Sequence, residues 1–128
     1  MIKYFDSSVL LQIILNLGDR AFLSEISQRG NFTSRLSQVE VLRTVMKIKP
    51  ELIEVAIDLL MELQFIEITS RVIDNASSYP QEISLKSSDA IHMATAELLL
   101  DVDDVLVTFD KQMALNAERL GIKVLTSF

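Results

Sequence analysis

The sequence of 128 residues contains no cysteine and no tryptophan, and it has only three glycines and two prolines. The absence of cysteine excludes disulfides, thiolate zinc sites and thiol nucleophiles. It suits a reducing compartment, and we expect the protein to be cytoplasmic. Because glycine and proline are the strongest breakers of regular structure, their scarcity predicts few and short loops.

Long apolar runs and an excess of positive charge are also missing. The most apolar early stretch, residues 9–17, is interrupted by Gln12 and Asn16 and is far shorter than the ~20 residues that span a bilayer. The 12 Lys and Arg residues are outnumbered by 18 Asp and Glu residues, which gives a net charge of −6. We therefore expect no membrane segment, and binding of nucleic acid would need a local basic rim or a divalent metal.

Apolar residues are abundant, at 49% of the sequence, and the mean hydropathy is +0.31. Disorder requires low hydrophobicity, so it is excluded as the main state. The length corresponds to one domain, because domains commonly contain about 100–150 residues. We expect a single domain over residues 1–128.

Patterns typical of strands and of helices alternate along the chain. Strands are predicted over residues 2–5, 31–36, 65–69, 105–109 and 122–125. Helices are predicted over residues 7–16, 37–47, 50–63, 70–78, 87–100 and 111–120, with a weaker pattern over 20–28. This alternation predicts an α/β fold with a parallel sheet that helices cover on both faces.

Four acidic residues stand out by their positions. Asp6 and Asp110 end predicted strands, and Glu40 and Asp89 lie in the first turns of predicted helices. Each has a structural explanation by itself. Glu40 follows Ser37 at the spacing of a capping box, Asp89 would favour a helix dipole, and Asp110 would cap a helix. Asp6, at the end of an apolar strand, is the hardest to explain in this way.

Taken together, the four acids would meet at the carboxyl ends of the parallel strands, where such sheets bind ligands. Two carboxylates about 5 Å apart repel by roughly 3 kcal/mol at an effective dielectric of 20, so the group needs a proton or a cation. Ligation by oxygen alone suits Mg²⁺ or Mn²⁺ rather than zinc. Such ions hold phosphates and activate water, which lets an acidic protein act on a polyanion.

Other polar residues lie beside these acids in the sequence. Ser7 and Thr108 could support a metal ligand or its water, or they could serve only as a helix cap and a strand former. His92, one turn after Asp89, is expected to be a hydrogen-bonded core residue, with a proton shuttle as the alternative. The acidic residues within 101–104 are expected to form a solvated loop.

Four segments of the sequence resemble the PIN-domain family. They are residues 5–8 (Phe-Asp-Ser-Ser), 37–43, 88–96 and 107–110 (Val-Thr-Phe-Asp). The most specific piece is Asp-Ala-x-His-x-Ala-Thr-Ala, which begins at Asp89. The closest likeness is to the ribonuclease toxins of VapBC-type toxin–antitoxin pairs, and it extends over nearly the whole chain.

This resemblance implies a three-layer α/β sandwich with about five parallel strands and Mg²⁺- or Mn²⁺-dependent cleavage of RNA. The metal-ligating and catalytic acids of the family correspond to Asp6, Glu40, Asp89 and Asp110. Its supporting hydroxyl groups correspond to Ser7 and Thr108. The resemblance also implies a small VapB-type antitoxin as partner, and a homodimer.

RNA binding is assigned to four basic residues that lie near the acids in sequence, Arg35, Arg43, Lys86 and Lys111. The alternative for these residues is ordinary surface solubility.

Two other protein classes have a similar layout, but each needs an acidic residue at a position where this sequence has none. A phosphoacceptor receiver domain needs an acid pair near the first strand, where Asp6 stands alone. A haloacid-type phosphatase needs a second Asp two residues after the first, where Ser8 stands. The remaining alternative is a PIN-like module that works by association without turnover, and the complete acidic set favours the nuclease.

Overall fold

The computed structural model describes residues 1–16 and 30–126. Within them lies a five-stranded sheet of order β3-β2-β1-β4-β5, in which every neighbouring pair is parallel. The strands are β1 (Lys3–Phe5), β2 (Asn31–Ser34), β3 (Gln64–Ile66), β4 (Val105–Val107) and β5 (Lys123–Leu125). The predicted parallel sheet is confirmed.

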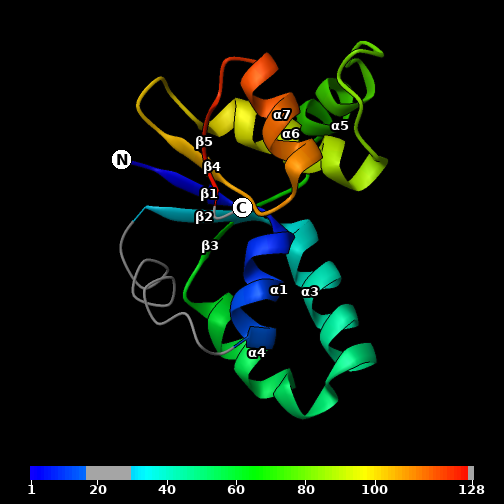
Figure 1. Cartoon of the computed structure of the whole chain (residues 1–128), viewed down its shortest axis with the longest axis vertical. Coiled ribbons are helices and arrows are strands. Elements are labelled where there is room, and N and C mark those ends of the chain that lie inside the picture. The colour runs from blue at the N-terminus through cyan, green and yellow to red at the C-terminus, as the bar shows by residue number, and fades with distance from the viewer. Residues whose placement is uncertain (17–29, 127–128) are drawn as a thin grey trace.

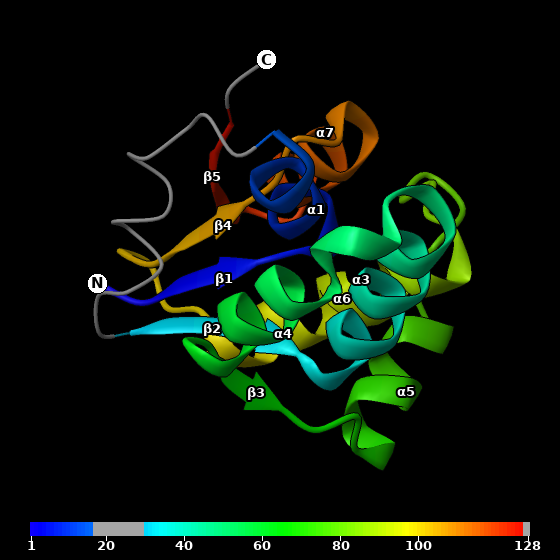
Figure 2. The same ribbon diagram turned by 90° about the horizontal axis from the view of Figure 1, so that it is seen from below.

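Helices cover both faces of the sheet (Figures 1 and 2). One face carries α1 (Ser7–Asn16), α3 (Arg35–Ile48) and α4 (Ile53–Met61), with a 3-10 turn at Pro50–Leu52 before α4. The other face carries α6 (Ser87–Leu99) and α7 (Lys111–Arg119), and α5 (Ser70–Ser77) packs against α6. The predicted three-layer sandwich is confirmed, while the weak helical pattern over 20–28 lies outside the described residues.

The alternation of side chains along β1 divides the core into two parts. Phe5 packs with Val41 and other residues of α1, α3 and α4, whereas Tyr4 packs with Met93 on the α6 and α7 side. Because helices cover both faces, Tyr4 is 0% and Phe5 1% exposed. The strand therefore delivers the next residue, Asp6, to an almost closed position, where it is 4% exposed.

The start of α3 differs from the prediction. Ser34, in extended backbone with φ −76° and ψ 149°, caps this helix, and its Oγ accepts a hydrogen bond from the Leu36 N–H at 3.0 Å. Ser37, the predicted cap, is buried inside the helix with its Oγ 2.6 Å from Thr33 Oγ1. The predicted capping box of Ser37 and Glu40 is therefore wrong, and Glu40 lies beyond the first turn.

The predicted strands over 65–69 and 105–109 are shorter in the structure, and the predicted helix over 50–63 is divided. Strand β4 ends at Val107, three residues before Asp110, which is the N-cap of α7. Among the described helices, none has the length and apolar character needed to cross a bilayer.

Candidate active site

The candidate site lies where the strand order of the sheet reverses. The chain runs from β1 outward through β2 and β3, and then returns to place β4 on the other side of β1. Open α/β sheets bind ligands in the crevice at the carboxyl ends of two such strands. Asp6 directly follows β1, and its N–H donates to the Val107 carbonyl at the end of β4, at 3.2 Å. Asp110 follows three residues later, so both acids stand at this crevice.

Hydrogen bonds hold the Asp6 carboxylate in one orientation. Its Oδ1 accepts from the N–H of Ser8 at 3.1 Å, from that of Val9 at 3.4 Å, and from the Ser8 hydroxyl. Asp6 therefore caps α1 itself, in place of Ser7, for which a cap was one of the two predicted roles. Burial raises the pKa of Asp6, and the hydrogen bonds from Ser8 and Thr108 only partly oppose this rise.

Thr108 links the ends of the two central strands. It is 0% exposed, its Oγ1 donates to Asp6 Oδ2, and the same oxygen accepts from the Asp110 N–H at 3.1 Å. The Ser8 Oγ lies 3.4 Å from this hydroxyl and accepts from the Phe109 N–H at 3.1 Å. These contacts favour the supporting role predicted for Thr108.

The second hydroxyl on Asp6 comes from Ser8, a residue that the sequence analysis did not select. An Asp side chain commonly accepts from the backbone N–H two residues on, and this turn brings Ser8 beside the Asp6 carboxylate. The supporting role of Ser7 stays a prediction.

Asp110 and Asp89 come from the first residues of two helices on the same face of the sheet. Asp110 Oδ1 accepts from the Met113 N–H at 2.9 Å, so the predicted cap is confirmed, and this bond occupies one of its two carboxylate oxygens. The pKa of Asp89 is raised by burial and then by the charge of Asp110, with smaller contributions from Asp6 and Glu40. Asp89 thus lies within electrostatic range of each of the other three predicted acids.

Glu40 reaches the site from the helix layer on the opposite face. Its Oε1 lies 2.6 Å from His92 Nε2, and His92 Nδ1 lies 2.7 Å from the Tyr4 hydroxyl. His92 is 1% exposed, so it is a hydrogen-bonded core residue, as the first of its two interpretations predicts. Tyr4 was not selected from the sequence, because no local pattern relates it to a histidine 88 residues away.

Residues 3–120 match the family model described as the PIN domain. The chain belongs to the PIN-domain family. It is 31% identical over 127 residues to Ribonuclease VapC35 of Mycobacterium tuberculosis, with 94% of this chain and 93% of that protein covered.

Solved structures have the same architecture as this PIN domain. A toxin–antitoxin complex from Klebsiella pneumoniae aligns with a TM-score of 0.73 and 25% identity over 98% of each chain. VapBC2 from Rickettsia felis, bound to a DNA fragment from its promoter, aligns with a TM-score of 0.75 and 16% identity over the full length of both chains. The second likeness shows the fold alone.

The donor set of this PIN domain fits a hard divalent cation. Among residues 1–16 and 30–126, no three Asp, Glu or His side chains are already grouped around one metal position. Mg²⁺ keeps several of its waters and needs only one or two carboxylates, so a closed cluster is not required. The raised pKa values of Asp6 and Asp89 mark carboxylates whose ionised forms a cation would stabilise.

The predicted RNA-binding residues have different surroundings. The Arg35 guanidinium forms a bidentate pair with Glu67, with Nη2 to Oε2 at 2.9 Å and Nε to Oε1 at 3.0 Å, and lies 4.4 Å from the centre of the Phe65 ring. Lys86 occupies the N-cap position of α6, and Lys111 is the first residue of α7, directly after Asp110. Arg35 would have to exchange its partner to bind a phosphate.

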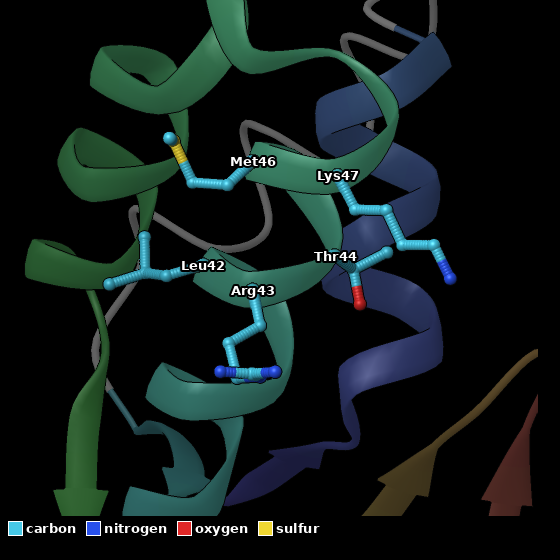
Figure 3. Close-up of a pocket in the computed structure, with 5 residues that line it drawn as sticks. All are labelled: Leu42, Arg43, Thr44, Met46 and Lys47. Carbon is cyan, nitrogen blue, oxygen red and sulfur yellow. The ribbon is translucent and has the colours of Figure 1, made fainter.

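Arg43 lies on α3 in a pocket, together with Leu42, Thr44, Met46 and Lys47 (Figure 3). Leu42 and Met46 extend to the α4 side, while Thr44 and Lys47 lie on the other side of α3 (Figure 3). The pocket contains none of the four acids, so it is a separate feature of the surface. RNA binding by the four basic residues stays a prediction.

Proposed function

We propose that this PIN-domain protein is a VapC-type ribonuclease and the toxin of a toxin–antitoxin pair, and that residues 1–128 act as one PIN-like domain. The observation that carries the proposal is the convergence of Asp6, Glu40, Asp89 and Asp110 at the point where strand order reverses. Similarity to a VapC ribonuclease over almost the whole chain supports it. The protein is an endoribonuclease of the cytoplasm in this proposal.

Asp6, Asp89 and Asp110 would hold Mg²⁺ or Mn²⁺, with Glu40 as a further ligand or as the group that orients the attacking water. The bound ion would supply charge neutralisation at the phosphodiester and an activated water. Ser8 and Thr108 keep Asp6 in a fixed orientation, so its carboxylate requires little rearrangement. No covalent intermediate is proposed, because cysteine is absent and both ring nitrogens of His92 are already engaged.

Two of the proposed partners, RNA and an antitoxin, follow from the charge of the site. RNA would be held by the predicted basic residues. Lys86 and Lys111 lie at the starts of α6 and α7, beside Asp89 and Asp110 in sequence, and Arg43 lies three residues after Glu40 on α3. A small VapB-type antitoxin would cover the acidic site and insert a basic side chain, since an uncovered negative cluster attracts Arg or Lys as it attracts a metal. A homodimer is also proposed, on the basis of the resemblance to the VapC-type toxins.

The test is cleavage of RNA by the purified protein after any bound partner has been removed. We expect cleavage with Mg²⁺ or Mn²⁺, loss of cleavage with EDTA, and recovery when the ion is added back. In cells, the wild-type chain expressed alone should slow growth, whereas the Asp6→Asn variant should not. If neither the wild-type chain nor Asp6→Asn slows growth, and the purified protein cleaves no RNA with Mg²⁺ or with Mn²⁺, the proposed nuclease is contradicted. That result would favour a module that acts by association.

A further inference from the structure

A buried chain of three side chains joins the core of the protein to the candidate site. Tyr4 lies on β1, His92 on α6 and Glu40 on α3, and the two contacts between them are 2.7 Å and 2.6 Å. Tyr4 packs in the α6 and α7 part of the core, whereas α3 covers the other face of the sheet. The contact between His92 and Glu40 therefore passes around the carboxyl-terminal edge of the sheet, where the acids meet.

The proton positions in this chain are fixed by its two ends. The Glu40 carboxylate can only accept a hydrogen bond, whereas the Tyr4 hydroxyl can donate one. If the imidazole is neutral, the phenol donates to Nδ1 and the ring proton must lie on Nε2. If the imidazole is charged, both nitrogens carry protons. In either case Nε2–H points to Glu40 Oε1.

This hydrogen bond decides how Glu40 presents its carboxylate. The Glu40 side chain is 26% exposed, and a glutamate on a helix surface has several rotatable bonds. The imidazole of His92, 1% exposed, has little room to move, because Tyr4 holds its other nitrogen. One carboxylate oxygen of Glu40 is thereby fixed, and the other is left to act in the site.

We propose that His92, itself fixed by Tyr4, is a positioning residue that holds the Glu40 carboxylate toward the other three acids for binding of a divalent cation. This inference rests on the proposed function, since it assigns a role within the same site. Ser8 and Thr108 orient the Asp6 carboxylate in a comparable way. Asp6, from the sheet, and Glu40, from the helix layer, are thus each held by hydrogen bonds.

Three substitutions separate the steps of this chain. His92→Leu removes the donor to Glu40, Tyr4→Phe removes only the hydroxyl that orients the ring, and His92→Gln retains an N–H donor for Glu40. Binding of Mn²⁺ alone, measured by the electron paramagnetic resonance signal of the free ion, is the readout independent of activity. We expect about 10–100-fold weaker binding for His92→Leu, a smaller loss for Tyr4→Phe, and substantial recovery for His92→Gln.

Tyr79→Phe is the matched control for Tyr4→Phe. The Tyr79 hydroxyl donates to the carboxylate of Glu97, at Oε1, and this pair involves none of the acids of the site. Removing this hydroxyl should leave Mn²⁺ affinity and RNA cleavage unchanged. A loss equal to that of Tyr4→Phe would overturn the specific role of the Tyr4 chain.

A double-substitution cycle shows whether His92 acts through Glu40. In a Glu40→Ala background, the further change His92→Leu should alter Mn²⁺ affinity less than about twofold, because the contact that it supports is already lost. Melting curves without metal identify the variants that fold. If His92→Leu does not fold, Tyr4→Phe takes its place in the cycle.

Unchanged Mn²⁺ affinity in the folded variants would overturn the inference, as would a His92 effect that persists undiminished without Glu40. Wild-type protein that binds Mn²⁺ but leaves RNA intact would overturn the proposed nuclease, while the affinities of the variants still decide the role of His92. Wild-type protein that binds no Mn²⁺ would overturn both.

Discussion

Two aspartates lie at opposite ends of the central strand pair, β1 and β4, and both are nearly buried. Asp6, at the carboxyl end, is 4% exposed, and Asp104, just before β4, is 9% exposed. Asp104 accepts hydrogen bonds from the N–H groups of Ile2 at 2.8 Å and Asp101 at 2.9 Å, which hold the pKa of its carboxyl below its usual value. The pKa of Asp6 is shifted in the opposite direction.

The comparison shows which buried acid indicates a functional site. Asp104 ties the start of β1 to the loop before β4 and stabilises the fold as a carboxylate. Asp6 is also hydrogen-bonded, but burial outweighs these bonds, so its ionised form costs stability. A buried acid is thus uninformative by itself, whereas an acid with a raised pKa among other acids is typical of a site that binds a cation.

The largest expected difference between the two aspartates is in RNA cleavage. Asp6→Asn should lower the single-turnover rate by about a hundredfold or more, because it removes a charged ligand of the proposed cation. Asp104→Asn should change this rate less than about twofold, since Asp104 lies at the other end of the strands. Similar rates for the two variants would remove the functional distinction between them.

Stabilisation by metal gives the next largest difference. An ion that binds only the folded protein should raise the free energy of unfolding by about 1.4 kcal/mol at ten times its Kd, or roughly 5 °C in Tm. We expect this Mg²⁺-dependent shift for wild type and for Asp104→Asn, and a much smaller shift for Asp6→Asn. Differential scanning calorimetry with EDTA and with Mg²⁺ measures it, and Ca²⁺-free NaCl at matched ionic strength is the control.

The role of Asp104 in folding predicts a loss of stability without metal. Asp104→Asn should lower Tm by a few degrees at pH 7. Because the pKa of Asp104 is lowered by folding, its contribution is present above its unfolded pKa of about 4 and is lost as pH falls through the folded value. The Tm difference between wild type and Asp104→Asn should therefore narrow in acid. A constant difference down to pH 3 would contradict this assignment.

The sequence predicted the parallel sheet and the positions of the site acids, since both depend on local patterns. Strand-forming runs end at Asp6 and near Asp110, and in a parallel sheet such ends meet at one edge. The helix start at Ser34 rather than Ser37 was not predictable from propensity, because both residues are serine. The choice depends on the register of β2 between β1 and β3, which pairs Ser34 with Ile66.

Contacts between distant segments account for the other differences. Asp104 was expected in a solvated loop, as Asp103 is, with its side chain 89% exposed and 3.7 Å from Lys123. Asp104 differs because it accepts from the Asp101 N–H within its own loop and from the N–H of Ile2, the residue before β1. The link from Tyr4 through His92 to Glu40 likewise joins three segments that only the folded sheet brings together.

The smallest expected effect is the change in Tm on replacing Asp89. It decides whether this acid is a metal ligand or only stabilises the start of its helix. The pKa of Asp89 is raised by burial and by the neighbouring acids. Folding therefore favours its protonated form, and as pH rises above about 4 its ionisation makes the folded state less stable. An acid in the first turn of a helix has the opposite tendency and stabilises by about 0.5–1 kcal/mol.

We expect repulsion to outweigh the helix dipole, because burial, Asp110, Asp6 and Glu40 all raise the pKa of Asp89, and the opposing effect of His92 is smaller than that of Asp110. In EDTA at pH 7, Asp89→Asn should therefore melt at the wild-type temperature or up to about 2 °C higher, since half-exposed charges interact weakly. The difference should vanish near pH 4, where the wild-type carboxyl is itself protonated. In Mg²⁺ the order should reverse, because only wild type retains the full donor set. The opposite result would be an Asp89→Asn variant that melts below wild type in EDTA and a wild-type Tm that Mg²⁺ does not change. Asp89 would then only stabilise the start of its helix, and its role would be structural, as that of Asp104 is.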